Sequence, residues 1–260
     1  MKRDVLEVLR ARIFAALAHG DEEKAQNGIA ELQAYEPAEA AGLRTALHIE
    51  AGRADEAFVA WQQRAALAPD DPYTIFLRAR IHVMENERIC ALTLLAPLLE
   101  QRLPAAVAEK AYNLAGQCAR FLGRAAEAVY YYAQARDAAE ELSLRALNAS
   151  NVLFNRHYLP ASLAEDRRAA EEYGALFADV RPFTHEKHNR SGERRLRIGY
   201  LSPDVREHVV LSFSHALMTA LDPARFEVFV YAMNRADSFT EKVRNAVDVF
   251  RNLSQLSAEE

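Results

Sequence analysis

The sequence predicts an α-helical repeat array followed by a partial parallel α/β segment, and three observations support this. Residues 1–140 are rich in Ala, Leu, Glu and Arg, with apolar residues at helical spacing. Short segments that begin with Gly or Asn recur within this half at intervals typical of helical repeats. After residue 195, apolar strand-like runs alternate with helical segments, an order that builds a parallel sheet with right-handed crossovers.

The composition is that of a globular protein whose charges are well mixed. The 260 residues are 50% apolar and carry a formal net charge of −5, which argues against a general nucleic-acid binder. The longest apolar run near the N-terminus, residues 13–18, is too short for a signal peptide or a membrane span. We therefore expect a cytoplasmic protein, or an excised piece of one, without nucleic-acid or membrane partners. Cys90 and Cys118 lack a CxxC partner and are expected to be buried and reduced.

Four similar segments recur along the helical half, and their closing alanines are 32, 34 and 37 residues apart. The segments are Gly20–Ala25, Gly52–Ala57, Asn86–Ala91 and Gly123–Ala128. Each leading Gly or Asn can take the left-handed conformation that ends a helix, and each Ala lets the next helix pack closely. Pro37 and Pro69 close the first two units. The pattern resembles the tetratricopeptide repeat.

Repeats of this kind stack into a superhelix with a concave face. That face is predicted to bind an extended peptide, and the alternative is a rigid spacer or a dimerisation element. Trp61, Tyr131 and Tyr132 are expected to pack between helices. His48 and His82 are expected in the core or along the groove; they lack metal-ligand spacing, and no metal site is predicted.

Residues 141–195 are predicted to form a helical linker followed by a polar connector. A helix over residues 146–158 stops before Pro160. Ser162, with Glu165 three residues later, has the capping-box spacing that begins another helix.

Residues 196–260 are predicted to form an incomplete Rossmann-like segment. Strands are expected over residues 196–201, 226–233 and 249–253, and helices over residues 209–221 and 239–247. The strands are apolar almost throughout, as expected when both sheet faces are covered. Ser238 and Glu241 have capping-box spacing. Because Gly199 is the last glycine, a glycine-rich phosphate loop is absent, and we expect this chain to hold no cofactor.

The turn after the first strand carries the candidate catalytic residues. Ser202, Pro203 and Asp204 form an abrupt polar turn, and a helix opens near His208. Ligands of open α/β domains bind at the carboxyl ends of strands, where this turn lies. A helix N-terminus favours the neutral imidazole, so His208 is expected to accept a proton or a hydrogen bond. The alternative is a histidine that only bonds the backbone at the start of the helix.

Three local features occur in a characteristic order. They are the repeats running into the α/β segment, Ser150–Phe154 followed by Tyr158, and Leu196–Asp204 with His208, Phe213, Arg225–Phe229 and Tyr231. Together they resemble the O-linked N-acetylglucosamine transferase family, including its plant SPINDLY branch and its bacterial relatives.

The resemblance implies a two-lobed GT-B glycosyltransferase that moves a sugar from a UDP-sugar donor to Ser or Thr hydroxyls of proteins. It places Asp204 and His208 on the family's Asp-x-x-x-His turn, with the histidine proposed as general base. It also implies that the concave face binds the protein acceptor. Residues 196–260 would be the start of the N-terminal catalytic lobe. The UDP-sugar would require a C-terminal lobe beyond residue 260, and the chain by itself is expected to be inactive.

Some positions depart from the family pattern. The second histidine of some relatives is Ser212 here. The asparagine ladder of animal enzymes is replaced, because its register falls on Ala11, Leu43, Leu77 and Leu114, with Asn113 one place off. A non-catalytic repeat scaffold and a GT-B enzyme with another acceptor remain as alternatives. Apolar residues Phe226, Val228 and Val230 and the following helix face need cover, from the repeats or by self-association.

Overall fold

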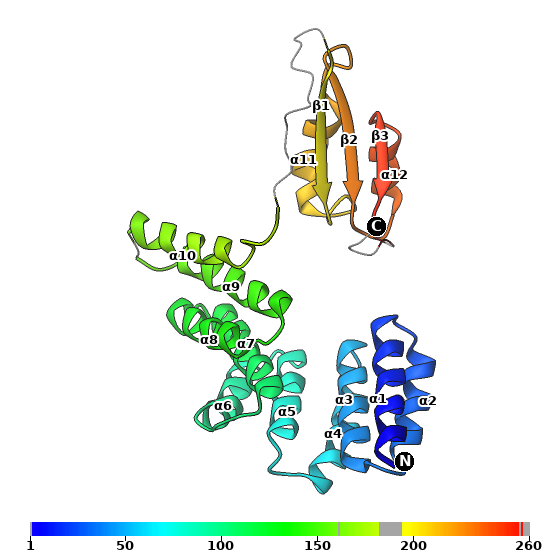
Figure 1. Ribbon diagram of the computed structural model, residues 1–260, viewed down its shortest axis with the longest axis vertical. Helices are drawn as coiled ribbons and strands as arrows, with labels where there is room; N and C mark the ends of the chain where they lie inside the picture. Colours follow the sequence, from blue (N-terminus) through cyan, green and yellow to red (C-terminus); the bar gives the residue numbers. More distant parts are fainter. Residues whose placement is uncertain (1, 161, 182–193, 255, 257–260) are drawn as a thin grey trace. The chain divides into compact units, whose positions relative to one another are not determined.

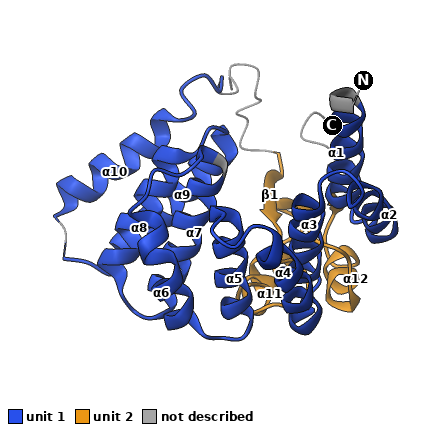
Figure 2. Ribbon diagram, turned by 90° about the horizontal axis from the view of Figure 1, so that it is seen from below, with its two compact units in different colours: residues 1–181 blue, residues 182–260 orange. Residues whose placement is uncertain are grey.

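The computed structural model describes residues 2–160, 162–181, 194–254 and 256. The chain divides into two compact units, residues 1–181 and 182–260, which Figure 2 shows in separate colours. Most of the polar connector predicted before residue 195 lies outside the described residues.

The first unit is a stack of helices (Figure 1). Helices α1 to α8 form four consecutive pairs, α9 packs against α8, and α10 packs against α9. The ten helices described in this unit are α1 (Lys2–Ala18), α2 (Glu22–Leu32), α3 (Pro37–Glu50), α4 (Ala54–Leu67), α5 (Pro72–Met84), α6 (Arg88–Leu99), α7 (Ala105–Phe121), α8 (Ala125–Ala138), α9 (Leu142–Arg156) and α10 (Leu163–Ala175). Helices α9 and α10, which fall within the predicted linker, belong to this compact unit.

The four predicted turns within the helix pairs are confirmed. Gly20, Gly52 and Gly123 have φ values of 67°, 73° and 74°, and Asn86 has a φ of 65°. The left-handed conformation costs glycine little and is tolerated by asparagine, so it ends the first helix of each pair and reverses the chain.

The predicted packing of the large aromatic residues is also confirmed. Tyr132 is buried against Gly116, where a Cβ atom would lie 2.9 Å from the tyrosine ring. Trp61 and Tyr131 are partly buried against the central core, and the Trp61 indole N–H donates to the Thr74 carbonyl at 2.9 Å. These residues therefore hold successive helices together.

The capped start of α10 is confirmed by reciprocal hydrogen bonds. The Ser162 hydroxyl accepts from the Glu165 N–H at 3.3 Å, and the Glu165 carboxylate accepts from the Ser162 N–H at 2.8 Å. None of the residues of α10 is buried, in agreement with its charged sequence.

The second unit contains a three-stranded parallel sheet in the order β1-β2-β3. Its described elements are β1 (Leu196–Ser202), α11 (Val209–Thr219), β2 (Phe226–Ala232), α12 (Ser238–Arg244) and β3 (Val249–Asn252). Val228 and Val230 of β2 are buried in a core that also contains Val205, Leu211 and Val243. The loop before α11 and both helices thus contribute to one apolar layer on one face of the sheet.

Within the described part of the second unit, helices cover only one face of the sheet, which differs from the sequence-based expectation that both faces are covered. Burial alternates along β2, and Leu201 of β1 is 66% exposed. The strand order moves in one direction, so both right-handed crossovers place their helices on the same face. The outer side of α11 also remains apolar, with Val209, Phe213 and Leu217 exposed at four-residue spacing.

The start of α12 also differs from the prediction. Asp237, rather than Ser238, is the capping residue, and Thr240, rather than Glu241, completes the capping box. The Asp237 carboxylate accepts from the N–H groups of Phe239 and Thr240, both at 2.9 Å. A carboxylate is favoured here because it also meets the positive end of the helix dipole.

Candidate functional site

A pocket with a cavity volume of about 690 Å³ opens beside the loop that follows β1. Residues 206–208 of this loop line it, together with Ser212 and His215 of α11 and Phe239 and Lys242 of α12. Because α11 follows β1 and α12 follows β2, the pocket lies at the carboxyl ends of two adjacent parallel strands. Open α/β domains bind their ligands in such places.

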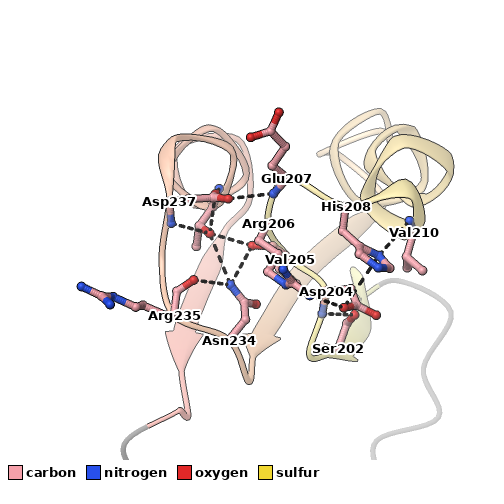
Figure 3. A network of polar contacts seen from close by, with 11 residues as sticks. Ser202, Asp204, Val205, Arg206, Glu207, His208, Val210, Asn234, Arg235 and Asp237 are labelled. Atoms are coloured by element: carbon pink, nitrogen blue, oxygen red, sulfur yellow. Dashed lines mark hydrogen bonds and ion pairs between the residues drawn. The ribbon is translucent and has the colours of Figure 1, made fainter. Parts of the chain in front are cut away.

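His208 lines this pocket and also caps α11. Its backbone is extended, and its Nδ1 atom accepts from the Val210 N–H at 3.2 Å (Figure 3). A ring nitrogen that accepts a hydrogen bond carries no proton, so a neutral His208 ring holds its proton on Nε2. With a side chain that is 34% exposed, the ring can donate from Nε2. For His208 to act as a base through Nδ1, its hydrogen bond with the Val210 N–H would first have to break.

Asp204 lies beside His208 but outside the set of residues that line the pocket. Its Oδ1 atom is 3.7 Å from His208 Nδ1 and 3.6 Å from an Arg206 guanidinium nitrogen. The first distance is too long for a hydrogen bond. The structure thus brings the two predicted catalytic residues together, and their catalytic roles remain predictions.

Side chains from the β2–α12 region hold the loop that carries these residues. The Val205 carbonyl accepts from the Thr240 hydroxyl at 2.7 Å and from the Asn234 side-chain amide at 3.1 Å (Figure 3). Val205 and Thr240 are fully buried. A buried polar network therefore holds the backbone between Asp204 and His208 in place.

Asp237 holds the same loop one residue before His208. One of its carboxylate oxygens accepts from the Glu207 N–H at 2.7 Å, and this bond is the main reason that the pKa of Asp237 is lowered. The contact joins residues that are thirty positions apart. Sequence reasoning missed it, because the only local signal was the Asp-x-x-Thr spacing at the start of α12.

We predict that Thr240→Val will lower the free energy of unfolding of the second unit by about 1–3 kcal/mol, since it removes the hydroxyl that satisfies a buried carbonyl. Hydrogen exchange of residues 203–208 should accelerate as well. Thr93→Val is the matched control, because the Thr93 hydroxyl bonds only the Ile89 carbonyl on an exposed helix face. Urea unfolding of both variants, combined with hydrogen exchange, tests the prediction. Equal small effects in the two variants would contradict it.

A second candidate site is the groove along the first unit, with a cavity volume of about 720 Å³. Most of its lining residues belong to α1, α3, α5, α7 and α9, which are the first helices of successive pairs and the helix that follows them. Leu47, Phe76 and Leu114 give it an apolar floor. Charged residues of both signs also line it, namely Arg80, Lys110, Asp21, Glu22, Glu50 and Glu109. Such a lining fits an extended chain with alternating apolar and polar side chains.

Asparagines occur at one end of this groove. The Asn113 amide donates to the Asn148 side-chain oxygen at 2.6 Å, and the Asn148 amide donates to the Glu109 carboxylate at 2.8 Å. Asn113 and Glu109 line the groove, whereas Asn148 is fully buried behind them. Leu77, which the ladder register assigns to the groove, is buried in the core instead.

The remaining predicted residues lie elsewhere. His48 and His82 stand at helix-pair turns, where His48 accepts from Arg53 at 3.1 Å and His82 contacts Glu87 at 2.7 Å. Burial lowers the pKa of His48. Cys118 is buried as predicted, and burial raises the pKa of its thiol to about 11. Cys90 is exposed, which corrects the prediction, because the first turn of α6 points it outward.

The segment that carries the pocket at the end of the sheet has a known counterpart. Residues 174–260 match the family model of glycosyl transferase family 41. The match includes every residue that lines this pocket. It confirms the resemblance to the O-linked N-acetylglucosamine transferase family that the sequence motifs indicated.

Two solved structures share the fold of this chain. An O-GlcNAc transferase mutant of Thermobaculum terrenum has a TM-score of 0.54 and 20% identity, with 98% of this chain and 42% of that chain covered. PilF of Pseudomonas aeruginosa has a TM-score of 0.51 and 15% identity, with 71% of this chain and 80% of that chain covered. The predicted fold class, a tetratricopeptide-repeat solenoid followed by a partial parallel α/β segment, is confirmed. The chain spans less than half of the Thermobaculum protein.

Among the described residues, none of the helices is long and apolar enough to cross a membrane.

Proposed function

We propose that this chain is part of a protein O-glycosyltransferase of the O-GlcNAc transferase type. In this proposal a UDP-sugar donates its sugar to Ser or Thr hydroxyls of a protein, and the repeat groove binds the protein acceptor. One observation carries the proposal: the family 41 match coincides with a pocket at the carboxyl ends of the strands, and His208 lines that pocket.

The charges around the pocket support an anionic ligand. Arg206 and Lys242 line it together with His208 and His215, against the single carboxylate of Glu207. An excess of cationic and hydrogen-bond-donating groups favours an anionic ligand, such as a nucleotide-sugar that a second, nucleotide-binding lobe holds against this pocket. The tautomer fixed by the Val210 N–H supports His208 as a hydrogen-bond donor to the sugar or to the acceptor group. A general-base role would require the His208 ring to rotate, so that its unprotonated nitrogen no longer bonds the Val210 N–H.

The groove of the first unit supports the acceptor role. Its length along successive helix pairs and its mixed lining suit an extended polypeptide better than a compact small molecule. A non-catalytic scaffold would use the same groove, but it gives no reason for the family 41 segment. That alternative is therefore less favoured.

The proposal is tested by titrating UDP and UDP-N-acetylglucosamine into this chain and into the natural gene product that carries residues 1–260. We expect no binding to the chain alone, and both binding and transfer of labelled sugar to protein by an enzyme that includes a nucleotide-binding lobe. A gene product that ends at Glu260, acts without a partner subunit and binds only peptides would overturn the proposal and favour the scaffold.

A further inference from the structure

The turn between α5 and α6 brings together three side chains of different ligand chemistry. Nδ1 or Nε2 of His82, a carboxylate oxygen of Glu87 and Sγ of Cys90 lie within 4.8 Å of one another. His82 is in the last turn of α5, Glu87 is the capping residue of α6, and Cys90 is in the first turn of α6. The sequence spacing gave no sign of this cluster, because the chain reversal at Asn86 creates it.

The backbone of this turn is well defined. Asn86 takes the left-handed conformation, and the Glu87 N–H donates to the His82 carbonyl at 2.7 Å. The three side chains therefore project from a fixed reversal that joins two packed helices. Such a frame reduces the conformational entropy that must be lost when a ligand is bound.

Comparison of the four equivalent turns shows what is particular to this one. Three positions are compared in each turn: four residues before the left-handed residue, one after it and four after it. The third turn has His82, Glu87 and Cys90 at these positions. The other turns have Ala16, Asp21 and Lys24 (first), His48, Arg53 and Glu56 (second), and Ala119, Arg124 and Glu127 (fourth). The first, second and fourth sets each include a lysine or an arginine. Among these four described turns, the third alone presents three metal-ligand types and no cation at these positions.

We propose that this turn binds a divalent transition-metal ion of the zinc type through His82, Glu87 and Cys90. A mixed set of imidazole, carboxylate and thiolate is typical of zinc and of neighbouring transition metals, whereas magnesium and calcium prefer oxygen ligands alone. Binding displaces the thiol proton of Cys90 to solvent. The ion would join α5 to α6 across the third turn.

The geometry permits the site with small side-chain rotations. Ligand atoms around a tetrahedral zinc ion lie about 3.4–3.6 Å apart, given the usual bond lengths. The Glu87 carboxylate is now 2.7 Å from His82 Nδ1 and must move slightly outward, which its 51% exposed side chain allows. A water molecule can supply the fourth ligand. So can Glu85, whose carboxylate oxygen lies 3.5 Å from His82 Nδ1, although this oxygen also lies 4.0 Å from an Arg78 guanidinium nitrogen.

The nearest arginine in the sequence does not occupy the site. Arg88 bonds the Asn86 side chain, and its guanidinium carbon lies 4.6 Å from the ring centroid of Phe121 on α7. Its charge is thus directed toward the neighbouring helix. Cys90 is exposed, so an ion can reach the thiol from solvent.

The test is a titration of the whole reduced chain with Zn²⁺ by calorimetry, and with Co²⁺ by absorption spectroscopy. We expect one strong equivalent of Zn²⁺ and, with Co²⁺, a thiolate charge-transfer band. His82→Ala and Cys90→Ser should each weaken binding at least about tenfold, since loss of even an outer-shell partner weakens metal sites by that factor. Zn²⁺ should also raise the melting temperature of the wild-type chain and not that of Cys90→Ser.

His48→Ala is the matched control, because His48 occupies the same position in the second turn beside an arginine. The affinity of the His48→Ala variant for Zn²⁺ should equal that of the wild type. Equal binding by Cys90→Ser and the wild type would overturn the site. A Co²⁺ complex of the wild-type chain that lacks a thiolate charge-transfer band would also overturn the site. This measurement does not depend on whether a variant folds. These outcomes are independent of sugar transfer.

Discussion

Replacing His208 with alanine should reduce the turnover of sugar transfer by about 100-fold or more in the active enzyme that carries this chain. A positioned imidazole that exchanges a proton or a hydrogen bond in the transition state contributes an effect of that order. The substitution also removes the Nδ1 acceptor that caps α11. Steady-state kinetics with a UDP-sugar and a protein acceptor measure the expected loss.

The variant His208→Asn separates the two roles of this side chain. Asparagine is a strong capping residue, so it should restore the start of α11 while it lacks the imidazole. We expect thermal stability close to that of the wild type and turnover as low as in His208→Ala. Full turnover in the His208→Asn enzyme would show that His208 acts only as a helix cap, and an unchanged His208→Ala would remove it from the mechanism.

Replacing Arg64 with methionine should lower the free energy of unfolding of the repeat unit by about 2–4 kcal/mol, because one buried acceptor and two partly buried acceptors lose their donor. The Arg64 side chain is only 8% exposed. Its guanidinium donates to the Ala38 carbonyl at 2.6 Å, the Thr74 hydroxyl at 2.9 Å and the Asp71 carboxylate at 2.7 Å. One side chain of α4 thus connects the starts of α3 and α5, and urea unfolding followed by circular dichroism measures its contribution.

Arg167→Met provides the comparison for this prediction. Arg167 pairs with Glu171 on the exposed face of α10, and such a pair contributes only about 0.3–0.5 kcal/mol. Similar urea midpoints for Arg64→Met and Arg167→Met would mean that the Arg64 guanidinium does not hold the helix pairs together. The packing of Arg64 against α3 also explains why residue 42 is glycine, because a Cβ atom at this position would lie 2.9 Å from an Arg64 guanidinium nitrogen.

Local signals in the sequence were sufficient for the order of elements. The left-handed residues Gly20, Gly52, Asn86 and Gly123 ended helices where predicted, because the backbone requirement at such a position depends on the residue itself. The apolar runs that begin at Leu196 and Phe226 formed parallel neighbours. The turn between Ser202 and His208 could likewise be placed at the carboxyl end of the sheet from the order of strand and helix alone.

The details of the candidate site could not be predicted in this way. Asp237, Thr240 and Asn234 hold the His208 loop through hydrogen bonds that span about thirty residues, and a single sequence carries no record of such pairs. The covered face of the sheet followed from the direction of both crossovers. The tautomer of His208 followed from one backbone N–H.

The sequence by itself thus determined which segments are helices and strands and where the chain turns, since these depend on periodicity and on backbone preference within a few residues. Only the tertiary structure decided which side chains meet, as with Cys90, Glu87 and His82, or Val205 and Thr240. The physical reason is that a contact depends on where two backbones are placed in space, which no local preference along the chain specifies.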